Sequence, residues 1–215
     1  MKNFALLMCA LLSFALPLSA PAQTEQKPAP LVQIEVIIFQ SLALRGWTEE
    51  FWPDSPELPN VDGATFFNSK DNYAKRLPTE SLTLHEEIAK MTPEKGYEVL
   101  AHFGWQQPSL PRDQALPILL DQTIQQHRLE ASILYGSVRM YQERFAHIEV
   151  DLELDRTIPQ AIRERFAEHQ QEDVDWMTEG WRFPLKEARR VRFGQLHYLD
   201  HPIYGVLIKV EQVKK

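Results

Sequence analysis

The residues near the C-terminus offer the most chemistry. In the stretch LHYLDHP, His197 and His201 stand four residues apart, with Tyr198 and Asp200 between them. Imidazole and carboxylate groups are common zinc ligands, and they also serve in acid–base catalysis. A helix would bring both imidazoles to one face, but Pro202 favours extended backbone before it and Asp200 suits a turn. We therefore favour a structural hairpin over a metal or catalytic centre.

A basic strip precedes this stretch in an otherwise acidic chain. Guanidinium groups suit carboxylates or phosphates, including the peptide carboxylates of a cell-wall polymer. The competing interpretation, which we favour, is that the strip pairs across strands with a nearby acidic row. Arg189, Arg190 and Arg192 are kept as candidate ligand contacts together with His197 and Tyr198. The strip comprises Arg182, Lys186, Arg189, Arg190 and Arg192, and the acidic row comprises Glu149, Asp151, Glu153 and Asp155.

Tryptophan rings could provide flat faces for sugars. Trp105 ends a predicted strand and is expected in the core. Trp47 and Trp52 lie in a long segment, residues 41–80, that is rich in turn-forming residues, and they are the candidate ligand contacts. Nucleophilic catalysis has no support, because the chain lacks GxSxG and SxxK motifs. A glycosidase-like pair of carboxylates stays open, because sequence spacing does not give their separation.

The first 22 residues are typical of a secretory signal peptide. Lys2 is followed by a short apolar run and by small residues at Ala20 and Ala22, so cleavage is expected after Ala22, with Ala20 as the second choice. The only cysteine, Cys9, lies in this run, and Met8 before it does not fit a lipidation site. Cleavage leaves 22 basic and 30 acidic residues, a formal charge of −8. We therefore expect an exported, periplasmic protein that does not span the membrane, binds no nucleic acid and needs no cofactor.

Strand patterns dominate the mature chain. In AHIEVDLELD, apolar and polar residues alternate as in a half-exposed strand, and LYGSVRMY should pair with it through a turn near residues 142–144. We predict an α+β fold with a predominantly antiparallel β-sheet: a flexible lead at 23–30, then a single domain at 31–213 with one or two short helices. We also expect a short strand at ILL and a short helix that opens with Pro159. The predicted strands lie near 31–40, 97–107, 132–141, 145–155, 184–197 and 203–212, and the predicted helix near 81–91.

The chain resembles the CsiV family of cell-shape-integrity, peptidoglycan-binding proteins. The resemblance rests on QIEVIIFQ, EEFWP, YEVLAHFGWQQP, LYGSVRMYQERFAHIEVDLEL and, above all, LKEARRVRFGQLHYLDHPIYGVLIKV. It marks Asp200, His201, Pro202 and Gly205 as a structural signature. It implies a non-enzymatic periplasmic protein that binds peptidoglycan and acts with a class A penicillin-binding synthase and the outer-membrane lipoprotein activator of that synthase. The alternatives are a periplasmic cell-wall hydrolase that uses His197, Asp200 or His201, and a pure protein–protein scaffold. The resemblance supplies no binding residues, and apart from EEFWP, residues 41–79 and 157–175 resemble nothing specific, so no ligand contacts are carried over to them.

Overall fold

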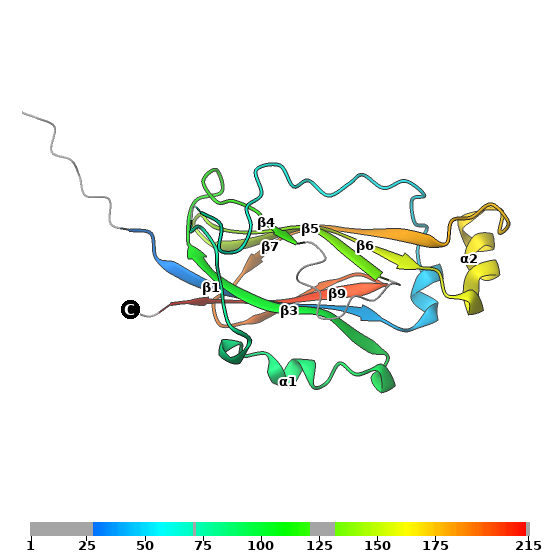
Figure 1. The fold of residues 1–215 in the computed structure, drawn as a ribbon, viewed down its shortest axis with the longest axis horizontal. Helices are drawn as coiled ribbons and strands as arrows, with labels where there is room; N and C mark the ends of the chain where they lie inside the picture. Colours follow the sequence, from blue (N-terminus) through cyan, green and yellow to red (C-terminus); the bar gives the residue numbers. More distant parts are fainter. Residues whose placement is uncertain (1–27, 71, 121–131, 214–215) are drawn as a thin grey trace, which may run out of the picture.

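Two antiparallel β-sheets stack face to face (Figure 1). The structure, a computed structural model, describes residues 28–70, 72–120 and 132–213. Sheet A has the strand order β2-β3-β1-β9-β8, and sheet B has the order β4-β5-β6-β7. Sheet A contains β1 (Leu31–Ser41), β2 (Lys75–Arg76), β3 (Tyr97–Pro108), β8 (Leu196–Asp200) and β9 (Tyr204–Gln212). Sheet B contains β4 (Ile118–Leu120), β5 (Ser132–Gln142), β6 (Ala146–Thr157) and β7 (Gly180–Val191).

Apolar side chains from both sheets meet in one core. Alternate residues of a strand point to the same face of the sheet, so each strand places one row of apolar side chains in the core. Trp105 of β3 is fully buried in this core, as predicted. Two of these rows are Val32, Ile34, Val36 and Ile38 in β1, and Ile148, Val150, Leu152 and Leu154 in β6.

Three short helices cover the outer face of sheet A. They are η2 (Thr79–Ser81), α1 (His85–Ile88) and η3 (Pro93–Lys95). Leu84, Ile88 and Met91 pack on Ile37 and Phe39, which β1 presents on this outer face. The segment therefore buries the apolar side of sheet A that the core does not use.

Glu35, on the same face of β1, anchors this segment. Its carboxylate accepts hydrogen bonds from the Thr83 backbone N–H (2.9 Å), the Thr83 hydroxyl (2.9 Å) and the Leu84 backbone N–H (2.8 Å). The Nε2 atom of His102 lies 2.8 Å from the carboxylate and donates to it, since an ionised carboxylate only accepts. Burial alone would raise the pKa of Glu35, but these hydrogen bonds outweigh it and lower the pKa to about 2.

The outer face of sheet B is crossed by the loop of residues 53–64. The Asn60 backbone N–H donates to Asp151 of β6 (3.2 Å), and the Ser137 hydroxyl of β5 donates to the Asn60 carbonyl (3.1 Å). The helices η1 (Leu44–Thr48), η5 (Gln160–Ile162) and α2 (Arg163–Gln170) lie at one end of the sandwich (Figure 1).

The predicted α+β fold with mainly antiparallel sheet is confirmed, and so is the hairpin between β5 and β6. The predicted strand at 184–197 is wrong. The chain leaves sheet B at Val191 and enters sheet A at Leu196, and Gly194 turns it with a φ of +76°, a region that favours glycine. The helix predicted near 81–91 is shorter, because Glu35 binds the backbone of Thr83 and Leu84 and only residues 85–88 are α-helical. The predicted signal peptide and most of the lead fall in residues 1–27, outside the described part.

Candidate ligand-binding surface

The C-terminal signature is the hairpin of β8 and β9. The strands pair from Leu196↔Lys209 to Asp200↔Gly205, which confirms the predicted hairpin. Leu199 points into the core, whereas Tyr198 is 42% exposed on the outer face of sheet A. Neighbouring residues of the signature therefore serve two different faces of the sheet.

The histidines and the aspartate of the signature do not converge. His197 lies on the Leu199 side of the strand, and its Nε2 atom accepts the backbone N–H of Arg192 at 3.0 Å, so its own proton is on Nδ1. Asp200 lies on the opposite side and accepts the Tyr198 hydroxyl at 2.5 Å. The two side chains are thus committed to different partners.

His201 packs against other rings and is not available as a metal ligand. Its ring stacks on Trp52 with centroids 4.9 Å apart, and its Nδ1 atom accepts the backbone N–H of Ile203 at 3.1 Å. Burial lowers the pKa of His201 to about 4, although Asp200 opposes the shift, so the ring is neutral at neutral pH. Within residues 28–70, 72–120 and 132–213, no three His, Cys, Asp or Glu side chains are grouped to hold a metal ion.

Three aromatic rings meet where β8, β9, β1 and β3 share the outer face of sheet A. The Tyr198 ring stacks on Phe39 at 6.0 Å, and Tyr97 meets Phe39 edge to face at 5.6 Å. Gly205 lies beneath them, since a Cβ atom there would stand 2.6 Å from Tyr198 and 2.8 Å from Phe39. The glycine of the signature is therefore what lets the two rings lie close to the sheet.

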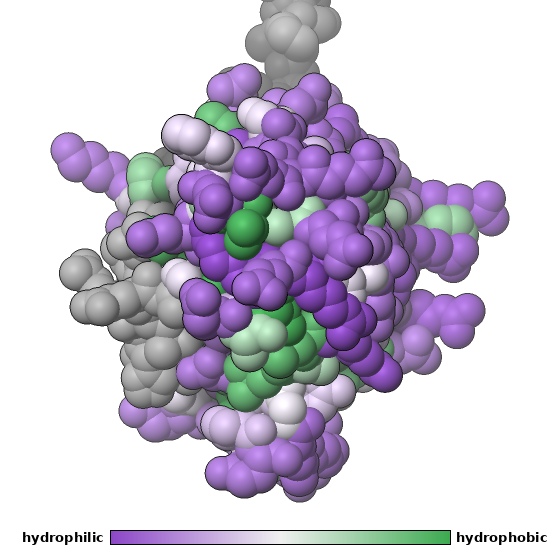
Figure 2. Space-filling model, turned by 90° about the vertical axis from the view of Figure 1, so that its right-hand side faces the viewer, coloured by the Kyte–Doolittle hydropathy of each residue, from purple (hydrophilic) through white to green (hydrophobic). Residues whose placement is uncertain are grey.

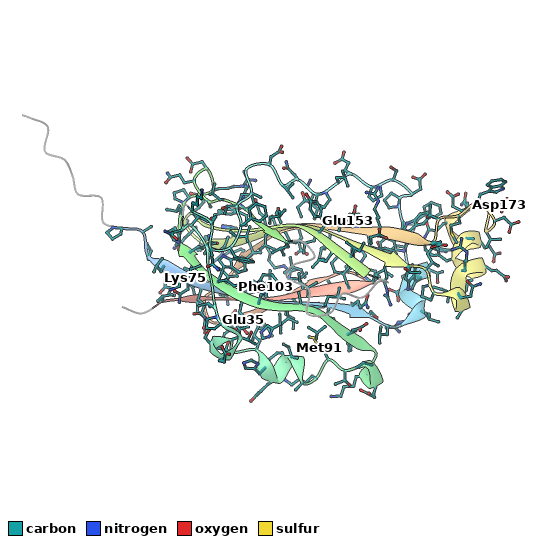
Figure 3. All side chains as sticks on the ribbon, viewed as in Figure 1. Glu35, Lys75, Met91, Phe103, Glu153 and Asp173 are labelled. Atoms are coloured by element: carbon teal, nitrogen blue, oxygen red, sulfur yellow. The ribbon has the colours of Figure 1, made fainter. Side chains whose placement is uncertain are left out.

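These rings border an apolar depression of about 300 Å³ that we call the aromatic hollow. The α1 segment supplies one wall through Lys90 and Met91. Figure 3 shows Glu35 and Met91 on the side of sheet A that carries α1, and Phe103 between the sheets. Tyr97 is 40% exposed, so two tyrosine rings face solvent here. The hollow is lined by Phe39, Lys90, Met91, Tyr97, Tyr198 and Leu207.

A second depression, of about 210 Å³, adjoins the first and shares its three aromatic residues. Its additional lining is mainly polar, and we call it the polar hollow. It lies toward the end of the sandwich that carries η1. That end is largely hydrophilic, with a smaller hydrophobic area below its centre (Figure 2). The polar side chains lining the polar hollow include Ser41, Arg45, Glu49, Asp200 and His201.

Tyr198 keeps its hydroxyl proton in this setting. Burial, followed by the hydrogen bond to Asp200 and the charge of that carboxylate, raises the pKa of Tyr198 far above its ordinary value. The hydroxyl therefore holds Asp200 in place at the border of the two hollows.

The first half of the basic strip pairs with the acidic row, as the structural interpretation expects. Arg182 approaches Glu153 at 3.4 Å, and Lys186 approaches Asp151 at 3.2 Å. Both pairs lie on the outer face of sheet B, across β6 and β7.

The second half of the strip has other partners. Arg189 forms an ion pair with Glu187 (2.7 Å) and donates to the Tyr198 carbonyl, so it ties the edge of sheet B to the edge of sheet A. The Arg190 guanidinium lies over the Phe145 ring at 3.3 Å. Arg192 is exposed. A ligand-binding role of these three arginines stays a prediction, and Arg189 also has a structural role.

The two tryptophans that the sequence suggested as ligand contacts are buried. Trp47 is fully buried and meets Phe166 and Phe183 edge to face at 5.4 and 5.1 Å. Trp52 is 5% exposed and donates its indole N–H to the Trp47 carbonyl at 3.1 Å. Their loop folds back over the end of the core, so we do not retain them as ligand contacts.

Sequence reasoning did not select Phe39, Tyr97 or Met91. Phe39 belongs to a nearly continuous apolar run in which inner and outer faces look alike, and Tyr97 merely opens a predicted strand. Only the strand register of the structure connects these residues to the signature, because Phe39 pairs with Gly205. The aromatic hollow has the composition of a carbohydrate-binding surface, with exposed rings beside hydrogen-bonding groups.

The comparisons with known proteins identify one family. A family model described as "Peptidoglycan-binding protein, CsiV" matches residues 3–213. No curated protein and no solved structure shows a significant match. Among the described residues, no helix has the length and apolarity needed to cross a membrane.

Proposed function

Because this chain belongs to the CsiV family of peptidoglycan-binding proteins, we propose that it is a non-enzymatic protein of the periplasm that binds peptidoglycan through the aromatic hollow. The observation that carries the choice of site is the pair of exposed tyrosine rings, Tyr97 and Tyr198, which both contact Phe39.

The glycan strand suits this surface for physical reasons. A sugar ring has an apolar face of C–H groups and a polar rim of hydroxyl and amide groups. Aromatic rings bury the apolar face, while nearby carboxylates and hydroxyls bind the rim. The aromatic hollow and the polar hollow provide these two kinds of contact side by side, with Asp200 at their border.

Sedimentation with purified sacculi tests the proposal. Tyr198→Ala and Tyr97→Ala should each reduce the bound fraction, and the double variant should reduce it further, because each ring contributes about 1 kcal/mol or fivefold in affinity. Phe66→Ala is the matched control, since Phe66 is also an exposed aromatic residue (57%) but does not line the hollow. Parent-like binding by the double variant would remove the hollow as the site. The same incubations should release no soluble muropeptides, with or without chelator; release would support the hydrolase alternative.

The partners implied by the resemblance belong to the same proposal. We expect the protein to act with a class A penicillin-binding synthase and the outer-membrane lipoprotein activator of that synthase, after export and cleavage at Ala22. The family membership supports this expectation, and pull-down of each purified partner by the mature protein tests it. Failure of both partners to bind would leave a protein that acts on the wall alone. Intact mass of the exported chain, beginning at Gln23 without lipid, tests the processing.

A further inference from the structure

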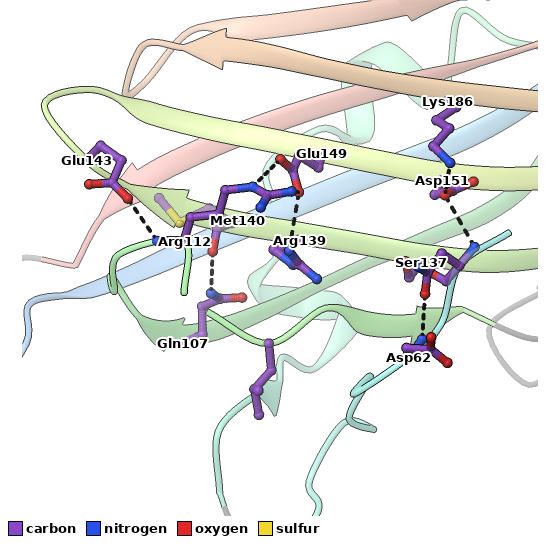
Figure 4. A network of polar contacts seen from close by, with 12 residues as sticks. Asp62, Gln107, Arg112, Ser137, Arg139, Met140, Glu143, Glu149, Asp151 and Lys186 are labelled. Carbon is purple, nitrogen blue, oxygen red and sulfur yellow. Dashed lines mark hydrogen bonds and ion pairs between the residues drawn. The ribbon is translucent and has the colours of Figure 1, made fainter. Parts of the chain in front are cut away.

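A charged cavity of about 280 Å³ lies on the outer face of sheet B, away from the aromatic hollow. Strands β5, β6 and β7 form its floor. The loop that carries Asn60 and the loop that carries Arg112 border it (Figure 4). Its charged lining is Arg112, Arg139, Glu149, Asp151, Lys186 and Glu187.

The strand register explains why this part of the sheet is hollow. Arg139, Glu149 and Ala188 form one row across the three strands. Ser137, Asp151 and Lys186 form the next row. The rows are about 7 Å apart, which is two residues along a strand. Each row therefore has one small side chain, Ala188 on β7 or Ser137 on β5. Asn60 lies over Ser137 and accepts its hydroxyl at 3.1 Å, whereas Ala188 is exposed and leaves space between the long charged side chains.

Two arginines of the cavity share one carboxylate of the sheet. Arg112 contacts Glu149 through Nε at 2.8 Å and Nη2 at 3.3 Å, and Arg139 contacts it at 3.5 Å. Glu143 accepts the backbone N–H of Arg112 at 3.0 Å, so it engages the backbone of Arg112 and not the guanidinium of Arg139. Asp151 is paired with Lys186 at 3.2 Å. Within the described part of the chain, Arg139 therefore has only a long contact to a carboxylate that Arg112 also binds.

Arg139 has donor capacity to spare. Among the described residues, its only side-chain hydrogen bond is the long one to Glu149, and its Nε atom is buried without a partner. A guanidinium has five N–H donors and binds carboxylates with two of them in parallel. Because Nε is enclosed by protein atoms, the N–H groups of the two Nη atoms are the donors of Arg139 that a carboxylate of a ligand in the cavity can use.

We infer that this cavity binds a carboxylate of a short peptide, which in the wall is the stem peptide of peptidoglycan. The inference rests on the proposed function for the source of the peptide. The carboxylate approaches Arg139 over Ala188, and the rest of the peptide extends through the cavity toward Asn60. The glycan and the peptide are therefore bound by opposite faces of the sandwich.

Titration of the full mature protein with a synthetic stem peptide that lacks sugar tests the inference, with binding followed by NMR or calorimetry. The parent should bind the peptide as the free acid. It should bind the peptide that is amidated at every carboxyl at least about tenfold more weakly, and its affinity for the free acid should fall as salt is added. Ala188→Leu fills the cavity without removing a charge and should weaken binding at least about tenfold. Arg139→Gln should do the same, and Ala161→Leu, at an exposed alanine elsewhere, should not.

The outcomes separate this inference from the proposed function. Equal binding of the acid and the amidated peptide, or equal binding by Ala188→Leu and the parent, overturns the inference even if sacculi still sediment with the protein. Binding of inorganic phosphate that competes fully with the peptide would show a general anion site and would also overturn it. Loss of sacculus binding in Tyr97→Ala/Tyr198→Ala with peptide binding intact supports both proposals, because each face then acts by itself.

Discussion

Glu35→Gln should show how much the buried carboxylate on sheet A contributes to the fold. Glu35 is 2% exposed and accepts hydrogen bonds from Thr83, Leu84 and His102. Glutamine keeps the shape of the side chain but removes the charge and one acceptor. The change therefore loosens the segment that supplies Met91 to the wall of the aromatic hollow.

The size of the effect follows from the pKa. A pKa lowered from 4.5 to about 2 means that the ionised carboxylate stabilises the folded state by about 3 kcal/mol. Because the folded-state pKa is the lower one, this contribution is complete above pH 4.5 and is lost as the pH falls from 4.5 to 2. We expect Glu35→Gln to cost about 3 kcal/mol at pH 7, and the difference from the parent to shrink steadily below pH 4.5.

Urea unfolding of parent and variant at several pH values between 7 and 3 measures this difference. Glu80→Gln, at an exposed glutamate of the same segment, is the control and should change the stability by less than about 0.5 kcal/mol. Hydrogen exchange at the Thr83 and Leu84 amides should accelerate in Glu35→Gln. A stability difference that is equal at pH 7 and pH 3, or absent at pH 7, would refute the electrostatic account.

Three further variants test the surface and the core. Gly205→Ala should displace the Tyr198 ring, because the new methyl would stand 2.6 Å from it. Sacculus binding should fall as in Tyr198→Ala, with a small loss of thermal midpoint. Unchanged binding would show that the aromatic hollow is not the binding site. Arg190→Gln/Arg192→Gln should make sacculus binding weaker and less dependent on salt at a nearly unchanged midpoint, whereas parent-like binding would make these arginines structural. Trp47→Ala should cost about 3–5 kcal/mol in urea unfolding, and a cost below 1 kcal/mol would contradict its burial.

The fold was predictable where the pattern of the chain is local. The alternation of apolar and polar residues in β6 follows from its one buried and one exposed face. Its pairing with β5 needs only a short turn. The division of the C-terminal segment between two sheets could not be predicted, because the sequence pattern of β7 and β8 also fits one long strand. Only the stacking of the sheets requires the chain to cross at Gly194.

The candidate site was predictable only in part, for a similar reason. The signature drew attention to Tyr198 and Gly205, and the structure gives both a role in the aromatic hollow. Their partners come from β1 and β3, more than ninety residues earlier in the chain, so no local pattern could connect them. The predictions for Trp47 and Trp52 were wrong because a loop rich in turn-forming residues is expected to be exposed, whereas this loop places these two side chains in the core and leaves Phe51 and Phe66 exposed.

The placement of the two proposed sites has a consequence for affinity. The two sheets of such a sandwich are about 10 Å apart, and the sites lie on the outer faces, so one stem peptide of a few residues at about 3.4 Å each cannot link them around the edge. Both sites can be filled together only by different parts of a polymer mesh, and the second contact then occurs at a high effective concentration. Intact sacculi should therefore bind more tightly than any soluble disaccharide-peptide, and Tyr198→Ala should weaken sacculus binding while leaving the affinity for free stem peptide unchanged. Equal affinity for sacculi and for the soluble unit would mean that only one face engages the wall.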